Sequence, residues 1–586
     1  MYALYCQFND KSRGRNMNLY KYVSDKLNEK LGYDAKLEIP RNREFGDFST
    51  NAAMVMARVA GKNPHDLATE ILPKIQELEF VKSASVAGPG FINITVQNDF
   101  LLKSAMTASE ITPTTKPMVI DMDYGAYNVA KSLHIGHMRT SIVGDVLYRI
   151  GRAFGHKMIS YNHIGDWGRP MGLVIAWIEK LHPDWPFFKP NFDANADYSN
   201  YTIDPHELDT YYPQSSALAK SDETFMAHAQ QITAELQNGH PGYMALYNIF
   251  LPIALASMDR TIKSLNIVPF DNDLGERNAA KYTATIEKML RDRNLLEPSD
   301  GAEIVIVKRN NDKKPMPPVM FYNSRGAVTY DATDIMALYY RKKTDNPDKV
   351  IYLTDSRQSL HFEQLFRVAE LLGLFPADAL EHIGYGTING PDNKPFKTRD
   401  GNVAELNDII EMVVSAVRDR VAESGKELDN KTIDMIALAA LKFNDLSHDL
   451  RADYIFDPKQ ITSFEGRTGP YILYTAVRLN SVLRRAGDFI APKTVELETD
   501  ERNLVMELLD FDRTVQSAFE SRATDLIANY AYDLAQLVNT FYHNCPILRD
   551  DVPTDTRNKR LTLVKVAVDV LTRTLDLMGL KIPKEM

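Results

Sequence analysis

The sequence predicts a mixed α/β protein with a small N-terminal α+β domain, a doubly wound parallel sheet carrying an insertion, and an all-helical C-terminal domain. Three observations favour this division. Short apolar runs alternate with helical segments in the middle of the chain, apolar residues after about position 406 recur at helical spacing, and 586 residues exceed the roughly 100–200 of one domain. The expected borders are 17–106, 117–405 with the insertion at about 182–266, and 406–586.

Residues 17–100 predict the first domain. Leu19, Val23 and Leu27 share one face of a helix. A second helix is expected over 51–59, and the alternating run 88–96 after a glycine turn predicts a strand. These elements favour a small α+β unit, which a Thr-rich linker separates from the rest of the chain.

The middle of the chain predicts the sheet. Strands are expected over 118–122, 156–163, 328–330, 350–354 and 380–388. Helices are expected between them, over 135–150, 171–179 and 360–372. Because strand–helix–strand crossovers generate parallel sheets, a ligand should bind at the carboxyl ends of the strands.

Two further regions complete the division. Residues 182–224 are rich in Asp, Pro, Asn and Tyr and interrupt the alternation, so we expect the surface part of an insertion that continues as helices to about residue 266. From about Leu406 onward the apolar spacing predicts helices almost exclusively.

Composition limits the class of protein. The net charge is −10, with 68 Lys and Arg against 78 Asp and Glu, which argues against sequence-independent coating of nucleic acid. Two cysteines, Cys6 and Cys545, exclude a disulfide scaffold and a Cys-ligated zinc site. No apolar run reaches the roughly 18 residues of a membrane span, and residues 1–16 lack the apolar core of a secretory signal, so a cytoplasmic protein without membrane attachment is expected.

The segment 128–137 carries the chemistry. It joins a strand to a helix start, where free backbone N–H groups favour phosphate. His134 and His137 are three apart and lie on one face, Gly136 admits close approach to the backbone, and Lys131 adds a positive charge. A His pair at a helix start is more often hydrogen-bonded structure or part of a metal site. The nearest additional metal ligands follow another strand, so no metal site is predicted here.

Several motifs together resemble one family. His-Ile-Gly-His at 134–137 after a strand is similar to the first signature of class I aminoacyl-tRNA synthetases. The other motifs are Asn128-Val-Ala-Lys131, Asn162-His-Ile-Gly-Asp-Trp-Gly168, and Asp355-Ser-Arg-Gln358-Ser-Leu-His361-Phe with Lys394-Pro-Phe-Lys397-Thr-Arg399. In their order along the chain, these motifs resemble those of arginyl-tRNA synthetases. The resemblance extends from Met17 to Met586. The resemblance implies a Rossmann-like catalytic sheet.

The resemblance also implies a reaction. The family condenses L-arginine with ATP, accompanied by Mg²⁺ and without zinc, to arginyl-adenylate and diphosphate, and transfers the arginyl group to tRNA(Arg). A monomer is expected. Two alternatives stay open, namely a class I paralogue for another amino acid and a non-catalytic tRNA-binding paralogue.

The implied catalytic residues lie in both signature regions. They are His134, His137, Lys131 and Lys397. Lys394–Gly401 replaces the missing second class I signature, so Lys397 is assigned to the leaving diphosphate, whereas without the resemblance it reads as a solvated loop lysine. The implied ATP contacts are Gly136, His134, His137, Gly165, Asp166 and His361.

Arginine recognition requires anions and acceptors, because a guanidinium offers only donors. Tyr330 and Asp334 are four apart and share a helix face. The resemblance assigns the arginine pocket to Asp123, Asn128, Tyr330, Asp334 and Gln358. On the sequence alone, Asp334 reads equally well as a helix N-terminal carboxylate. The family usually has proline where this chain has Tyr127.

The predicted RNA contacts lie in the two outer domains. Tyr471, Tyr474 and Arg478 have helical spacing, and aromatic rings with arginine commonly hold unpaired bases, although a core tyrosine with a surface arginine is the more frequent arrangement. The resemblance favours a helical anticodon-binding domain and an N-terminal domain that touches the tRNA elbow. The implied contacts are Tyr474, Arg478, Tyr542, Met586, Phe91 and Asn93.

Overall fold

The computed structural model describes residues 18–586 except 35, 41–42, 126, 325, 391, 395 and 397–403. These residues form two compact units. The described parts of Met1–Thr114, Ser424–Ser447 and Thr462–Met586 make up unit 1, and those of Thr115–Glu423 and His448–Ile461 make up unit 2.

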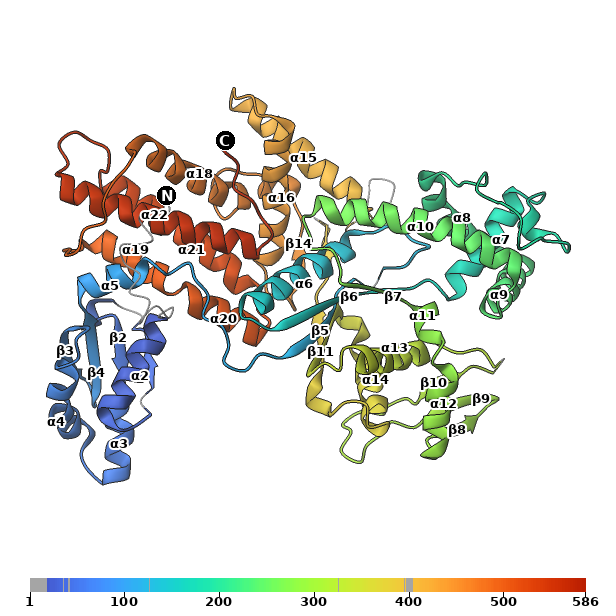
Figure 1. Ribbon diagram of the computed structural model, residues 1–586, viewed down its shortest axis with the longest axis horizontal. Coiled ribbons are helices and arrows are strands. Elements are labelled where there is room, and N and C mark those ends of the chain that lie inside the picture. The colour runs from blue at the N-terminus through green and yellow to red at the C-terminus, as the bar shows by residue number, and fades with distance from the viewer. Residues whose placement is uncertain are drawn as a thin grey trace. The chain divides into compact units, whose positions relative to one another are not determined.

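The N-terminal part of unit 1 is a four-stranded antiparallel sheet with helices (Figure 1). Its elements are α2 (Leu19–Leu31), β1 (Leu37–Glu38), η1 (Arg43–Phe45), β2 (Phe48–Thr50), α3 (Ala52–Ala60), α4 (Pro64–Gln76), β3 (Val81–Ala87), β4 (Phe91–Val96) and α5 (Asn98–Ala105). The predicted elements at 51–59 and 88–96 are confirmed as α3 and β4, whereas α4 and β3 were not predicted. Ile92 and Ile94 point into the core from β4, and Phe91 and Asn93 occupy its other face.

The C-terminal part of unit 1 is helical. Its helices are α16 (Asn430–Leu446), α18 (Gly469–Ala486), α19 (Thr499–Leu509), α20 (Phe511–Ser521), α21 (Asp525–Asn544) and α22 (Thr554–Leu577). A Cβ at Gly469 would lie 2.1 Å from the Ala439 carbonyl oxygen, so only glycine lets α18 start this close to α16. The prediction of a helical C-terminal region is confirmed.

Unit 2 is built on a five-stranded parallel sheet of order β12-β11-β5-β6-β7. The strands are β5 (Val119–Asp123), β6 (Lys157–Ile164), β7 (Asn272–Gly275), β11 (Lys349–Asp355) and β12 (Leu380–Tyr385). The chain runs outward from β5 through β6 and β7, then returns to the other side of β5 with β11. This makes the carboxyl ends of β5 and β11 the topological switch point, where doubly wound sheets bind ligands. The predicted parallel sheet is confirmed.

Unit 2 also contains further helices and short elements, of which α8 and α9 lie away from the five-stranded sheet (Figure 1). They are α6 (Ile135–Ala153), α7 (Arg169–Leu181), η2 (Pro186–Phe188), α8 (Pro205–Ser221), α9 (Glu223–Gln237), α10 (Pro241–Ser264), α11 (Glu276–Ala280), α12 (Thr283–Asp292), α13 (Tyr330–Thr344), η3 (Ser356–Gln358), α14 (Ser359–Leu371), η4 (Ala377–Ala379), β13 (Ile388–Asn389), α15 (Leu406–Glu423), β14 (Tyr454–Ile455) and α17 (Pro458–Ile461).

One predicted strand is wrong. Residues 328–330 do not join the main sheet, because Thr329 is the N-cap of α13 and Tyr330 is its first residue. The Thr329 hydroxyl accepts a hydrogen bond from the Ala332 N–H, which satisfies a free donor of the first helical turn. Val328 instead bridges Tyr322. A three-stranded antiparallel sheet of β8 (Leu296–Ser299), β9 (Ala302–Val305) and β10 (Val319–Tyr322) was not predicted.

The insertion is helical, as expected, with α8, α9 and α10 ending at Ser264. Within the described part of the chain, α10 is the one helix that is long and apolar enough to cross a membrane, judged by length and composition, and 39% of its apolar window is buried. Leu246, Tyr247 and Phe250 on its buried face pack into the apolar cluster of the insertion, which accounts for its composition.

Candidate functional site

The first signature forms the start of α6, directly after the switch-point loop. His134 is the N-cap: its Nδ1 accepts a hydrogen bond from the Gly136 N–H at 3.1 Å, and Nδ1 of His137 accepts one from the His134 N–H at 3.0 Å. A Cβ on Gly136 would lie 2.9 Å from Cε1 of His134, so glycine lets the imidazole lie against the helix start.

Both imidazoles are neutral donors. Burial and the neighbouring cations lower the pKa of His134, and burial with the adjacent His134 and Lys131 lowers the pKa of His137 to about 3. Because Nδ1 is the acceptor in each ring, the remaining proton lies on Nε2. Each ring therefore presents an Nε2–H group for an anion at the helix start.

Tyr127 is built into this site. Its side chain is buried, its hydroxyl lies 3.1 Å from Oγ of Ser141, and its ring packs edge-on against His137 with centroids 6.0 Å apart. These contacts hold the Tyr127 side chain beside the first signature.

Asn128 and Gly165 hold the loop before α6. The Gly165 N–H donates to the Tyr127 carbonyl at 2.8 Å, and the Val129 N–H donates to the Gly165 carbonyl at 3.2 Å. Oδ1 of Asn128 accepts from the Ala130 N–H at 3.1 Å. The backbone after β5 and the backbone after β6 are therefore joined, and Gly165 contributes as a support of the loop.

The residues of α13 that are predicted to bind the substrate arginine form a cluster with two histidines. Nε2 of His361 lies 2.7 Å from Oδ2 of Asp334, and Nδ1 of His361 lies 2.8 Å from Oδ1 of Asp331. Nε2 of His163 lies 3.3 Å from the other oxygen of Asp334. The ring of Tyr330 lies tilted against that of His361, with centroids 5.0 Å apart, and Tyr330 is 58% exposed.

Electrostatics within this cluster favour a charged His361. Burial opposes the imidazolium, but the hydrogen bonds to Asp331 and Asp334 outweigh it and raise the pKa of His361 to about 9. Burial alone would raise the pKa of Asp334, yet His361, His163 and Arg341 lower it below its usual value. Two carboxylates and one imidazolium leave a net negative charge, which suits a guanidinium ligand.

Sequence reasoning missed Glu276, the first residue of α11. Its Oε2 accepts a hydrogen bond from the Trp167 N–H at 3.3 Å. Burial raises the pKa of Glu276 to about 7, His163 opposes the shift, and Asp334 adds to it, so these three groups share one electrostatic environment. The position of Glu276 directly after the carboxyl end of β7 could have indicated this residue. The strand itself was not recognised, because its sequence Asn-Asp-Leu-Gly does not resemble a strand.

Three other residues that were predicted to bind arginine or ATP pair with side chains or backbone groups of the protein. The Asp123 carboxylate forms a buried ion pair with Arg341. Asp166 accepts from the Tyr247 hydroxyl at 2.8 Å and from the Arg277 N–H at 3.2 Å, so both of its oxygens support α10 and α11. His361, predicted for ATP, is hydrogen-bonded to Asp334.

Two predicted residues of unit 2 remain, Gln358 and Lys397. Gln358 is exposed at the end of η3, one turn before His361. Lys397 lies outside the described residues. The turn before it is tight, because the Gly390 N–H donates to the Lys394 carbonyl at 2.7 Å.

Arg139 connects the base of this turn to the first signature. Its buried guanidinium donates through Nη1 to the Gly386 and Ala452 carbonyls, each at 2.9 Å, and through Nη2 to the Asp449 carbonyl at 3.0 Å. Gly386 lies two residues before β13, so α6 holds the segment that leads into Lys394.

The predicted RNA contacts of the C-terminal region come together in unit 1. The Arg478 guanidinium lies 5.4 Å from the Tyr474 ring centroid and 5.1 Å from that of Tyr542. Lys426 lies 6.0 Å from the Tyr474 centroid and donates to the Met586 carbonyl at 3.1 Å. Tyr474 is 37% exposed, which leaves an edge of the ring accessible.

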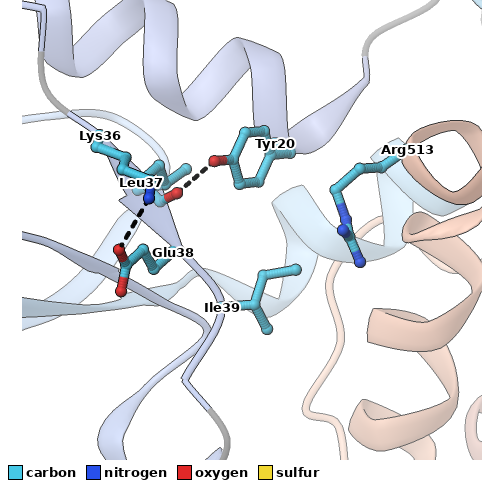
Figure 2. Close-up of a pocket in the computed structure, with 6 residues that line it drawn as sticks. All are labelled: Tyr20, Lys36, Leu37, Glu38, Ile39 and Arg513. Atoms are coloured by element: carbon cyan, nitrogen blue, oxygen red, sulfur yellow. Dashed lines mark hydrogen bonds and ion pairs between the residues drawn. The ribbon is translucent and has the colours of Figure 1, made fainter. Parts of the chain in front are cut away.

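Two other clusters of polar groups are internally satisfied. The cavity of about 380 Å³ shown in Figure 2 is lined by Tyr20, Lys36, Leu37, Glu38, Ile39 and Arg513. Both Nε and Nη2 of Arg513 bind Asp510 at 2.6 Å, and Nζ of Lys36 lies 3.5 Å from Glu38. The lining therefore offers mainly paired charges.

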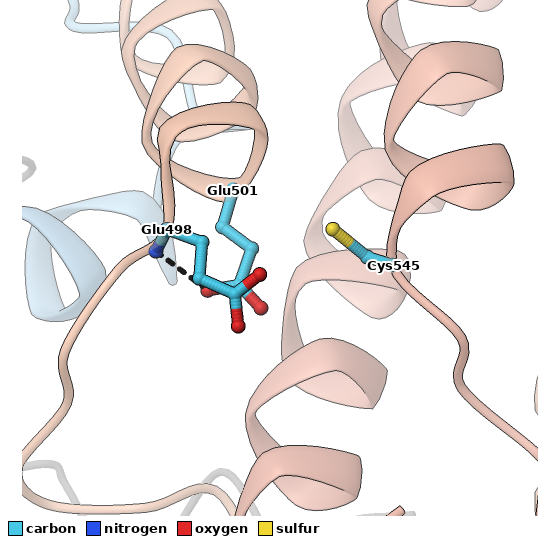
Figure 3. Close-up of side chains that lie close together, drawn as sticks. All are labelled: Glu498, Glu501 and Cys545. Carbon is cyan, nitrogen blue, oxygen red and sulfur yellow. Dashed lines mark hydrogen bonds between the residues drawn. The ribbon is translucent and has the colours of Figure 1, made fainter.

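Figure 3 shows Glu498, Glu501 and Cys545 close together. Both oxygens of Glu501 are paired, with Lys559 at 2.6 Å and Arg560 at 2.9 Å, and Arg560 also binds Glu498. Burial raises the pKa of the Cys545 thiol to about 11, so it stays protonated. Two cations already neutralise the carboxylates, which makes this an ion-pair network between α19 and α22.

Comparison with known proteins covers nearly the whole chain. Three family models match in succession: "Arginyl tRNA synthetase N terminal domain" over 17–96, "tRNA synthetases class I (R), catalytic domain" over 96–458 and "DALR anticodon binding domain" over 472–586. Relatives named arginine–tRNA ligase include that of Alkaliphilus oremlandii, 38% identical over 583 residues with 96% of this chain and 98% of the relative covered.

A second relative and two solved structures agree. The arginine–tRNA ligase of Agathobacter rectalis is 36% identical over 589 residues, covering 96% of this chain and 98% of its own length. The Thermus thermophilus arginyl-tRNA synthetase structure superposes with a TM-score of 0.80 at 23% identity, covering 97% of this chain and 99% of that one. The Plasmodium falciparum structure gives 0.77 at 22%, with the same coverage, and at these identities the two structures support the fold alone.

Proposed function

The chain belongs to the arginyl-tRNA synthetase family of class I aminoacyl-tRNA synthetases, and from this premise we propose how its residues divide the work. The protein is an arginine–tRNA ligase, which uses ATP to attach L-arginine to tRNA through an arginyl-adenylate. The proposal below rests chiefly on one observation: at the switch point, neutral histidine donors at a helix start accompany a carboxylate–histidine cluster with net negative charge.

His134 and His137 act on the α-phosphate. Attack of the arginine carboxylate on this phosphate builds negative charge on its oxygens, and preorganised Nε2–H donors stabilise that charge without a proton being moved. Because both imidazoles are neutral, positive charge must come from other groups. We assign it to Lys131, to Lys397 at the leaving diphosphate, and to the Mg²⁺ that enters with ATP as part of the substrate.

Asp334 binds the guanidinium of arginine. A bidentate, charge-assisted pair rejects uncharged analogues and fits lysine poorly. Glu276 is a further acidic group of this pocket, a role supported by the environment it shares with Asp334 and His163. Tyr330, Asn128 and Gln358 complete the contacts of the amino acid.

Three further residues support the pocket indirectly. His361 holds the Asp334 carboxylate in place, and it is also proposed to contact ATP, as the motif implies. Asp123 acts through the buried Arg341, and Asp166 through the start of α11. Gly136 and Gly165 are proposed to contact ATP through their backbone.

The tRNA contacts lie in unit 1. We assign the anticodon loop of tRNA(Arg) to Tyr474, Arg478, Tyr542 and Met586, a role supported by the cation–π contacts of Arg478. Phe91 and Asn93 are assigned to the tRNA elbow. The proposed domains are 17–106, 117–405 and 406–586, and the enzyme is proposed to act as a cytoplasmic monomer with no membrane attachment and no zinc.

Charging assays test this proposal. The purified protein should attach arginine, and no other amino acid, to tRNA, and ATP–diphosphate exchange should require tRNA. Charging with another amino acid, while arginine stays at background, would refute the proposed pocket. Gel filtration with light scattering tests the monomer.

A further inference from the structure

The acidic insertion packs on the loop that precedes α6. Val129 and Ala130 of this loop are 4% and 6% exposed and belong to the same apolar cluster as Leu208 and Tyr211 of α8. Apolar side chains in one close-packed cluster restrict each other's positions. The insertion therefore contributes to fixing the backbone immediately before Lys131.

The next two residues of the loop also face the insertion. Nζ of Lys131 lies 5.1 Å from the centroid of the Tyr212 ring, which sits at the edge of the same cluster. Burial raises the pKa of Asp209 on α8 and of Glu405, and a hydrogen bond with Ser132 opposes the rise in each. Residues 208–212, which form one turn of α8, therefore interact with the four consecutive loop residues 129–132.

We propose that Tyr212 of the insertion is a positioning residue for Lys131 and holds its ammonium beside the His134 helix start for the phosphates of ATP. This inference rests on the proposed role of Lys131 in adenylate formation. It gives the insertion a part in catalysis although none of its own side chains touches the reacting atoms.

A tyrosine ring suits this task better than a carboxylate. The lysine stem has many rotamers, and a ring face restricts them by attracting the ammonium without neutralising it. A carboxylate in the same place would compete with phosphate for the charge. The attraction is weak at an exposed site, so Lys131 can transfer to ATP once ATP is bound, and the expected cost of losing the ring is a two- to fivefold fall in kcat.

The test compares Tyr212→Leu with Tyr212→Phe, each alone and combined with Lys131→Met, in tRNA-dependent ATP–diphosphate exchange. Tyr212→Leu should lower kcat two- to fivefold with the KM for arginine unchanged, and Tyr212→Phe, which keeps the ring, should restore most of it. In the Lys131→Met background, Tyr212→Leu should have no further effect. A second readout is independent of catalysis: the rate at which an N-hydroxysuccinimide ester acylates Lys131, followed by mass spectrometry, should rise in Tyr212→Leu alone.

The results of these experiments distinguish the catalytic role of Lys131 from the positioning role of Tyr212. If Lys131→Met keeps the wild-type kcat, the catalytic role of Lys131 is refuted, and the positioning role with it. If Lys131→Met is impaired but Tyr212→Leu lowers kcat equally in both backgrounds, Tyr212 acts through the fold and the inference is overturned. Unchanged acylation of Lys131 in Tyr212→Leu would overturn it as well.

Discussion

Replacing Asp334 by asparagine tests the arginine pocket most directly. The Asp334 carboxylate lies 2.7 Å from Nε2 of His361 and 3.3 Å from Nε2 of His163, so it is held in place before arginine arrives. Asparagine keeps the size of the side chain and one acceptor oxygen but removes the charge. His361 retains Asp331 as a partner at 2.8 Å, so the local fold should persist.

The expected effect follows from the lost pair. A charge-assisted hydrogen bond contributes about 1.5–3 kcal/mol, and a guanidinium bound in bidentate fashion makes two. Asparagine keeps one acceptor, so the variant loses one of the two bonds, about 1.5–3 kcal/mol, which corresponds to roughly a 10- to 100-fold rise in the KM for arginine at 1.4 kcal/mol per factor of ten. The KM for ATP should change less than twofold.

Steady-state charging kinetics, with arginine and ATP varied separately, measure this effect. Asp331→Asn is the matched control, because Asp331 binds the opposite nitrogen of His361 and its side chain is 26% exposed. It should raise the KM for arginine at most fivefold. Equal losses of arginine and ATP affinity in Asp334→Asn, or equal effects of the two variants, would show that Asp334 is structural and refute the pocket.

Three further predictions concern the histidines, a buried acid and the RNA contacts. His137→Ala should lower the rate of adenylate formation about 10²–10³-fold, as expected for a lost oxyanion donor, with tRNA affinity unchanged in a filter-binding assay. Burial raises the pKa of Asp121 to about 7, against 3.8 in the unfolded chain, so the stability it contributes is complete below pH 4 and is lost as pH rises through 7. Asp121→Asn should therefore gain stability over the wild type by about 2 kcal/mol between pH 5.5 and 8.5 in urea unfolding, and the exposed Asp378→Asn should show no such trend. Arg478→Ala should raise the KM for tRNA about tenfold with the KM values for ATP and arginine unchanged, a selectivity that a folding defect would not produce.

Local patterns made the catalytic sheet predictable. The apolar run of β5, the helical spacing of α6 and the apolar run of β6 are each encoded within a few residues, and their alternation determines a parallel sheet. The His134 helix start was predictable for the same reason, since a capping motif is local in sequence.

Other features depend on contacts between distant residues. The strand β7 exists because it pairs with β6, while its own sequence has no strand preference. The histidine of the 355–362 motif reaches Asp334 because α13 and α14 pack together, and no spacing within either helix indicates this. Tyr212 lies far along the chain from Lys131 and within a segment whose composition suggested only surface.

The neutral state of the histidine pair explains why this site needs its lysines. With the pKa of His137 at about 3, raising the pH from 6 to 8 does not change the charge of His137. The negative charge of the transition state must then be met by hydrogen bonds from Nε2 and by the fixed cation Lys131. A neutral histidine such as His137 stabilises a phosphate equally well across the physiological range, but it leaves the placement of the positive charge to the loop 129–132. Because that loop is packed against α8, a substitution in the insertion should change kcat more than it changes the affinity for arginine.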